Sequence, residues 1–154
     1  MMTRVTLIVA VVFFAGPVTG NCGPATAIVE TIVAHHLASA QRGDVDSVMA
    51  DYAADAVLIT PDTAITGRSA IRAVFQRLVG GNSAPGDSPG ALQVQKRVFK
   101  GNVGYLLWVQ HAGTQGEVRG SDTFFVHNGK IVAQTVVMVP VSPPPSDRGR
   151  DHPN

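Results

Sequence analysis

The sequence is poor in the residues that most specialised sites require. Cys22 is the only cysteine, so no disulfide can form within the chain. The five histidines include no pair four residues apart that could bind a metal from one helix together with a carboxylate. A glycine-rich phosphate loop, a Gly-x-Ser-x-Gly turn and a cysteine–histidine pair are also missing from the sequence. We therefore expect no metal site and no cofactor.

Excess charge of either sign is also absent. The chain carries 12 basic and 11 acidic side chains, for a formal net charge of +1, and the basic residues form no cluster. This balance excludes the electrostatic attraction by which nucleic acids and anionic membranes recruit basic proteins. What is present is an apolar fraction of 45% in 154 residues, which is enough for one globular domain with its own core.

Long apolar runs are missing as well, and the clearest run is too short to span a membrane. It covers residues 5–15, follows Arg4 and ends at Gly16-Pro17. Residues 18–20 then offer the small side chains of a cleavage site. This pattern predicts a signal peptide over residues 1–20 and a secreted or periplasmic mature protein.

Two alternatives remain for the N-terminal segment. Residues 5–15 could instead form a buried helix, although Gly16-Pro17 would end it abruptly. Cys22 could carry a lipid anchor, but Asn21 before it fits the recognition sequence for lipidation poorly. We therefore expect free secretion and keep a lipoprotein as the alternative.

The rest of the chain divides into one domain, residues 21–139, and a tail, residues 140–154. The tail is rich in proline and charge and is predicted to be disordered. Within the domain, helical periodicity comes first and strand-like alternation follows. The expected helices cover residues 24–41, 45–52 and 67–78, the expected strands cover 56–60, 92–100, 103–111, 117–127 and 130–139, and a flexible loop covers 80–90. Helices followed by a meander indicate the α+β class, with a curved antiparallel sheet wrapped around the N-terminal helices and a pocket between them.

Five short motifs carry a family resemblance. They are Gly43-Asp44-Val45-Asp46, residues 52–57, residues 67–71, residues 122–126 and residues 128–132. Together they resemble the nuclear transport factor 2-like superfamily, which includes ketosteroid isomerase and the SnoaL-like polyketide cyclases. The resemblance implies a cone-shaped sheet of the cystatin-like α+β barrel type and a homodimer. Because this fold hosts enzymes, binders and structural modules alike, it does not fix the function.

Asp122 is the first candidate for chemistry. Strand alternation places it on one face with Phe124 and Val126, where a carboxylate is costly unless it is paired or protonated. An exposed charge on an edge strand is the alternative interpretation. The resemblance implies an acid–base role, because Asp122 matches the oxyanion-hole aspartate of ketosteroid isomerases and a similarly placed aspartate of SnoaL-like cyclases.

His36 is the second candidate, on the apolar stripe of the first predicted helix. Counting back from Gly43, it matches the oxyanion-hole tyrosine of ketosteroid isomerases, so the resemblance implies that His36 and Asp122 lie close together. They would then share a proton as an acid–base pair, and a buried histidine satisfied by a nearby acceptor is the alternative. Thr60 stands where the isomerases place their general base, and a hydroxyl cannot act as that base near neutral pH. The usual steroid isomerisation is therefore not expected.

The remaining pocket wall is predicted to be apolar. Alternation gives two sets of candidate wall residues in addition to Phe124 and Thr60, namely Tyr105, Leu107 and Val109 on one strand and Gln134, Val136 and Met138 on the last. Trp108 would then lie on the outer face with Phe125 and Val137, which a second subunit would cover.

Two functions remain open from the sequence. One is a cofactor-free isomerase, cyclase or hydrolase that acts on a small apolar carbonyl compound or epoxide through Asp122 and His36. The other is a ligand-binding or dimerisation module that uses the same pocket without chemistry. An enzyme requires Asp122 to face the pocket with a perturbed pKa, whereas a binder requires only an apolar cavity.

Overall fold

The computed structural model describes residues 23–80, 92–114 and 116–141. The predicted signal peptide, Cys22 and most of the predicted loop and tail lie outside this part of the chain. Within it, three helices and a six-stranded sheet form the α+β architecture that the sequence predicts.

The helices begin and end where local chemistry requires. α1 (Pro24–Gln41) begins with a proline, whose missing N–H would have no partner in the first turn anyway. The chain leaves this helix through Gly43 at a φ of 74°, which glycine adopts without strain. α2 (Val45–Asp51) is capped by Asp44, whose carboxylate accepts a 3.0 Å hydrogen bond from a first-turn backbone N–H. α3 (Arg68–Gly80) follows the first two strands.

The strands form one sheet in the order β2-β1-β6-β5-β4-β3. Their bounds are β1 (Tyr52–Ile59), β2 (Ala64–Thr66), β3 (Gln93–Lys100), β4 (Val103–Gln110), β5 (Val118–His127) and β6 (Lys130–Pro140). The β3–β6 meander is antiparallel as predicted, but β1 pairs with β6 in parallel. No hairpin joins β1 to β6, so no tight turn imposes an antiparallel direction on this pair. β2 was not predicted from the sequence.

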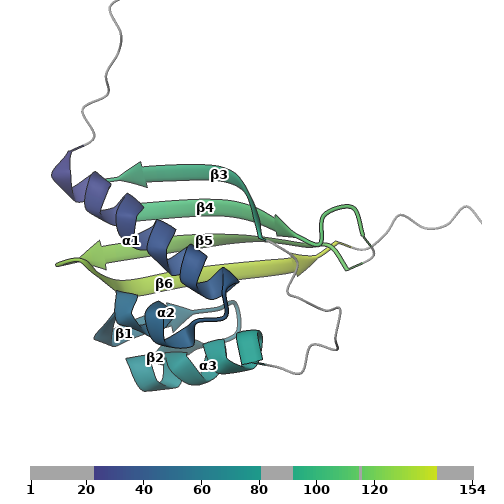
Figure 1. Ribbon diagram of the computed structural model, residues 1–154, viewed down its shortest axis with the longest axis horizontal. Coiled ribbons are helices and arrows are strands. Elements are labelled where there is room, and N and C mark those ends of the chain that lie inside the picture. The colour runs from purple at the N-terminus through teal and green to yellow at the C-terminus, as the bar shows by residue number, and fades with distance from the viewer. Residues whose placement is uncertain (1–22, 81–91, 115, 142–154) are drawn as a thin grey trace, which may run out of the picture.

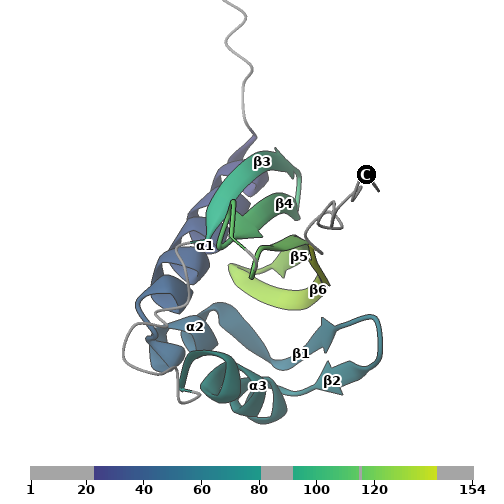
Figure 2. The ribbon, with the colours of Figure 1, turned by 90° about the vertical axis from the view of Figure 1, so that its right-hand side faces the viewer.

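The sheet is curved and open, and the helices occupy its inner side. Figure 1 shows α1 running across the sheet, with α2 and α3 beside β1 and β2. In Figure 2, a quarter turn away, the strands bend around the space that α1 and α3 cover. This arrangement confirms the predicted wrapping of the sheet around the helices.

The core fills the base of this curved space. The fully buried side chains come from α1, α2, β1, α3 and the meander, and include Val33, Met49, Tyr52, Phe124 and Ile131. Burying one large apolar side chain contributes about 1.5–3 kcal/mol, so this contact between helices and sheet dominates the stability of the domain. Over residues 23–80, 92–114 and 116–141, no helix has the length and apolarity needed to cross a membrane.

Candidate functional site

A cavity of about 300 Å³ opens between the helices and the inner face of the sheet. α1 and α3 form one wall, β1 forms a second, and the long strands β4, β5 and β6 form the third. Its lining is mainly aliphatic and aromatic, with a few polar side chains among them. A cavity of this size and composition suits a small organic molecule.

Asp122 provides the carboxyl group of this cavity. It lies on β5 with its side chain on the inner face, and only 6% of the residue is exposed. Trp108 Nε1 donates a hydrogen bond of 2.5 Å to Oδ2, and Gln134 Nε2 donates one of 2.7 Å to Oδ1. Burial raises the pKa of Asp122, and the two hydrogen bonds oppose this rise because they stabilise the carboxylate. The carboxyl group is therefore fixed in position while its pKa moves toward neutrality.

Gln134 extends this arrangement to a second buried group. The Tyr52 hydroxyl donates a hydrogen bond to Gln134 Oε1 while the amide nitrogen of Gln134 donates to Asp122. A glutamine amide has one acceptor and one donor end, so it can connect these two groups without an unsatisfied atom. Burial raises the pKa of Tyr52, and the nearby charges of Asp122 and Asp51 raise it further. Tyr52 therefore stays protonated and acts as a donor.

A glycine makes room for the indole that holds Asp122. Gly120 lies directly opposite Trp108 in the β4–β5 register, two residues before Asp122. A Cβ atom at Gly120 would lie 2.3–2.7 Å from three atoms of the Trp108 ring. Because side-chain atoms do not approach a Cβ so closely, the indole can lie against β5 and reach Asp122 only if residue 120 lacks a side chain.

His36 borders the same cavity but belongs to a different set of contacts. Its ring is 3% exposed and packs edge-on against Tyr52, Phe75 and Phe124, with centroid distances of 5.4, 5.6 and 5.4 Å. Burial lowers its pKa from 6.5 to about 4, with a smaller contribution from the charge of His35. His36 is therefore neutral at neutral pH, and its Nδ1 has no hydrogen-bond partner within residues 23–80, 92–114 and 116–141.

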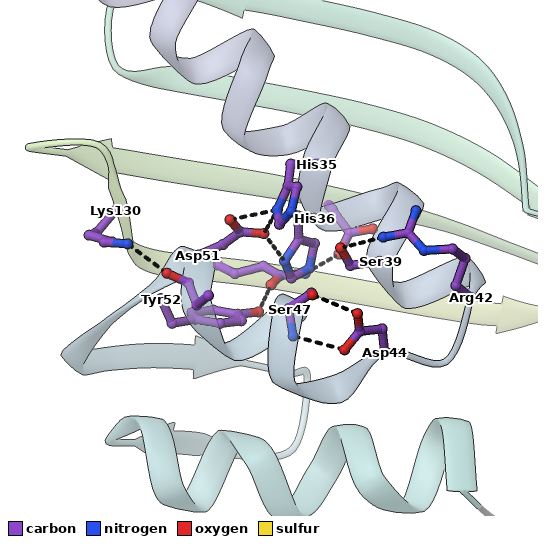
Figure 3. A network of polar contacts seen from close by, with 12 residues as sticks. His35, His36, Ser39, Arg42, Asp44, Ser47, Asp51, Tyr52 and Lys130 are labelled. Atoms are coloured by element: carbon purple, nitrogen blue, oxygen red, sulfur yellow. Dashed lines mark hydrogen bonds and ion pairs between the residues drawn. The ribbon is translucent and has the colours of Figure 1, made fainter.

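The carboxylate nearest to His36 Nδ1 is Asp51, at 3.8 Å. His35 Nδ1 approaches the same carboxyl group more closely, at 2.9 Å from each oxygen. Figure 3 shows the Asp51 carboxylate beside both histidines, with Lys130 on its other side. Burial raises the pKa of Asp51, while the hydrogen bond and charge of His35 and the charge of Lys130 lower it. Asp51 thus joins the end of α2 to α1.

The structure brings most of the predicted site residues together. The lining residues that the sequence predicted are Asp122, His36, Thr60, Phe124, Gln134, Val136 and Met138. However, no hydrogen bond between His36 and Asp122 is found among the described residues, because each has other neighbours. The nearest carboxylate to His36 Nδ1 is on α2, and Asp122 is bonded to Trp108 and Gln134.

The prediction for β4 was wrong by one residue. Tyr105, Leu107 and Val109 are not among the lining residues, and the cavity is lined instead by Trp108 and Gln110 from this strand. Leu106 pairs with Asp122 and Trp108 pairs with Gly120, so the even-numbered residues of β4 share the inner face with Asp122. Both faces of β4 are apolar, and alternation alone therefore could not say which one faces inward.

Sequence reasoning also missed Trp108, Tyr52 and Asp51 as members of these networks. Trp108 was assigned to the outer face together with its strand. Tyr52 and Asp51 lie at the α2–β1 junction, where the predicted helix ran one residue too far. Gly120 was the available signal for Trp108, since a glycine within a strand often marks the close approach of another group.

A family comparison agrees with this fold. The family model for the SnoaL-like domain matches residues 33–134. The chain belongs to the SnoaL-like domain family. Among curated proteins no relative is found.

Solved structures show the same fold at low sequence identity. An NTF-2 like protein of unknown function from Burkholderia xenovorans is 18% identical, with a TM-score of 0.64 over 80% of this chain and 92% of that one. A candidate ketosteroid isomerase from Kribbella flavida is 17% identical, with a TM-score of 0.61 over 83% and 90% of the two chains. A candidate SnoaL-like polyketide cyclase from Shewanella denitrificans is 16% identical, with a TM-score of 0.59 over 73% and 90%. At these identities the likeness concerns the fold alone.

Proposed function

We propose that this SnoaL-like domain takes a small apolar molecule into its cavity and that Asp122 is the group that exchanges a proton with it. The observation that carries the proposal is the Asp122 carboxyl group, buried at the edge of an apolar cavity and held by one donor on each oxygen. General acid–base catalysis works best with a pKa near the working pH, and burial moves that of Asp122 in this direction. The reaction class is a cofactor-free isomerisation, cyclisation or hydrolysis of a carbonyl compound or epoxide.

In this proposal His36 does not share a proton with Asp122, as the sequence had suggested. A direct proton exchange with Asp122 lacks the hydrogen bond that it would need, and the lowered pKa keeps the imidazole neutral. We propose that His36 takes part as a neutral polar group that borders the ligand. Its ring position is fixed by Tyr52, Phe75 and Phe124. In this role the imidazole can accept or donate one hydrogen bond without adding charge to the cavity.

The catalytic proposal is tested by substitution of Asp122. Asp122→Asn keeps the shape of the side chain and removes the exchangeable proton, so turnover of a carbonyl compound or epoxide should fall by about 10²–10⁴-fold. Val137→Thr, on the opposite face of the sheet, serves as the control and should retain the activity. Turnover that persists in Asp122→Asn would exclude Asp122 as the proton-transfer group.

Binding without chemistry is the second candidate function. It is favoured by Thr60, which lines the cavity at the place where related isomerases carry a carboxylate base, and by the low pKa of His36. Mass spectrometry of the protein after denaturation would identify a co-purified ligand. A tightly held molecule that is released unchanged, together with no turnover, would support this second candidate over the first.

Export and self-association complete the proposed function. The pattern of residues 4–20 supports secretion, and N-terminal sequencing of exported material should find a start near Asn21.

The outer face of the sheet exposes Leu107, Phe125 and Val137, which supports a homodimer that covers them. Phe125→Lys should then shift sedimentation toward the monomer, and sedimentation as a monomer before any substitution would exclude the dimer.

A further inference from the structure

The described residues that line the cavity include an acidic side chain but no lysine or arginine. Among the described residues that line it, Asp122 carries the carboxyl group, His36 is the other titrating side chain, and no lysine or arginine is present. The remaining polar side chains are the neutral Gln41, Thr60, Gln110 and Gln134. Among the described residues that line the cavity, an ionised Asp122 therefore has no cationic side chain as a counter-charge.

Three basic side chains on the neighbouring elements are engaged elsewhere. Arg42 at the end of α1 donates to Ser39 Oγ at 3.2 Å, and Lys130 in the β5–β6 hairpin donates to the Ala50 carbonyl at 2.7 Å. Figure 3 shows both on the α1–α2 side of the molecule. Arg72 on α3 pairs with a carboxylate of α2. None of these cations is among the lining residues of the cavity.

Asp122 retains capacity to bind a donor. A carboxylate offers about four lone-pair sites, and the two hydrogen bonds from Trp108 and Gln134 occupy one on each oxygen. Because both donors are neutral, they hold the carboxylate in position without neutralising its negative charge. The desolvation of this carboxyl group is already part of the folded state, so a cationic ligand would incur only its own desolvation on binding.

The walls around Asp122 also favour a positive ligand. Trp108, Phe75 and Phe124 line the cavity, and the faces of aromatic rings attract ammonium groups. A negative ligand would meet the opposite conditions, because it would be buried beside a carboxylate with no cationic side chain to pair with. A neutral ligand could donate a hydrogen bond to Asp122 but would not neutralise its charge.

From this arrangement we infer that the ligand of the cavity is a small apolar amine, bound as its ammonium ion against Asp122. The inference rests on the proposed function, since it names the chemistry of the molecule that the same cavity takes. Among carbonyl compounds and epoxides it selects those that also bear an amino group.

Three probes of matched shape test the inference, namely benzylamine, benzyl alcohol and benzoate. Trp108 is the only tryptophan in the chain and lines the cavity, so its fluorescence and its single indole N–H resonance report binding directly. At neutral pH and low salt, benzylamine should bind at least about tenfold more tightly than benzyl alcohol, as a desolvated ion pair with aromatic contacts would give. Benzoate should bind most weakly.

Substitution then assigns the preference to one residue. In Asp122→Asn the advantage of benzylamine over benzyl alcohol should fall to less than about twofold, because the counter-charge is gone. Glu30→Gln removes one negative charge from an exposed position of α1 and is the matched control, which should keep the preference. A benzylamine preference that survives in Asp122→Asn would overturn the inference, and so would its loss in the Glu30→Gln control.

The ranking in the unaltered protein decides the question even if a variant does not fold. Equal binding of the three probes, or tighter binding of benzoate, would refute the amine inference and leave an apolar ligand cavity in place. Failure of all three probes to perturb the indole resonance would refute the inference and the proposed ligand cavity together. The two failures are therefore distinguishable in one set of titrations.

Discussion

Asp122 and Asp51 are both buried carboxyl groups whose pKa is raised by burial, yet their surroundings differ in kind. Asp51 is held by His35 at 2.9 Å and lies close to the Lys130 charge, at the junction of α1, α2 and the β5–β6 hairpin. Asp122 is held by an indole and an amide, both neutral, and borders a cavity. One carboxyl group is paired within the protein, and the other is fixed in position with its charge uncompensated.

This difference indicates which carboxyl group is available to a ligand. A buried carboxyl group that is hydrogen-bonded to a side chain of a neighbouring helix contributes mainly to the folded structure. A buried carboxyl group with neutral donors keeps its charge for a partner from outside, at some cost in stability. His36 lies between the two regions, since its ring packs on the cavity side and its Nδ1 faces Asp51 at 3.8 Å.

The largest expected effect is the loss of stability at low pH that the burial of His36 causes. Its pKa is about 4 when folded and 6.5 ordinarily, so the unfolded chain binds a proton in this range that the folded chain does not. The stability present above pH 6.5 should therefore be lost as the pH falls to 4, by about 3 kcal/mol in total. Urea unfolding of the wild type and of His36→Phe at several pH values measures this loss as their difference.

Comparison with the variant is needed because the two carboxyl groups act in the opposite direction. Asp51 and Asp122 have a raised pKa when folded, so their contribution to stability grows as the pH falls toward 3.8. Both remain in His36→Phe, and the difference between the proteins isolates the histidine. A difference that stays constant from pH 7 to 4 would show that His36 is not desolvated in the folded protein.

Gly120 provides the next largest effect, confined to the cavity region. Gly120→Ala would place a Cβ atom 2.3 Å from the Trp108 ring, and the resulting overpacking should destabilise the protein by about 2 kcal/mol. Displacement of the indole would also remove a donor from Asp122 and raise its pKa. Chemical unfolding and NMR of the Asp122 carboxyl carbon measure the two consequences.

A double-mutant cycle shows whether this effect passes through Trp108. In a Trp108→Phe background the smaller ring leaves room for the added methyl group, so Gly120→Ala should cost much less and should not change the Asp122 titration. The His35 resonances, in the other region, should be unchanged in every variant. Equal costs in the two backgrounds would show that Gly120 matters for the backbone and not for the indole.

Much of the fold followed from the sequence because the relevant signals are local. Gly43, the capping residue Asp44 and the Asn128-Gly129 turn each determine an element boundary through backbone geometry or a nearby hydrogen bond. The inward position of Asp122 followed from its alternation with Phe124 and Val126. The parallel pairing of β1 with β6 did not follow, since it depends on contacts between segments that are more than 70 residues apart in the sequence.

The site was predictable only where one face of a strand differs from the other. On β6 the polar Gln134 marked the inner face correctly. On β4 both faces are apolar, with Tyr105, Leu107 and Val109 on one and Leu106 and Trp108 on the other. Only the β4–β5 register, a tertiary property, decides which face points inward. The contact of Asp51 with both histidines depends on how α2 packs on α1, which neither helix reveals alone.

Asp51→Asn is the third prediction and tests the other region. The amide keeps the shape but loses the negative charge that His35 contacts and that the charge of Lys130 stabilises, so the unfolding free energy should fall by about 1.5 kcal/mol. Binding of a ligand probe, followed by Trp108 fluorescence, should be unchanged. If Asp51→Asn weakened binding as much as Asp122→Asn does, the two regions would be one functional unit and the contrast between them would fail.

Tyr52→Phe should have the smallest effect and is the sharpest test of how Asp122 is held. The substitution removes the hydroxyl that donates to Gln134 Oε1, and a buried acceptor without its partner costs about 1 kcal/mol of unfolding free energy. The amide of Gln134 is then less polarised and free to rotate, so its hydrogen bond to Asp122 weakens and the pKa of Asp122 rises. Urea unfolding gives the first quantity and NMR titration of the Asp122 carboxyl carbon gives the second. Since Trp108 still donates to Oδ2, the rise should be smaller than in Gly120→Ala. A loss of stability with an unchanged Asp122 titration would mean that Tyr52 only packs against the core, and that the carboxyl group is held by Trp108 and Gln134 without help from the core.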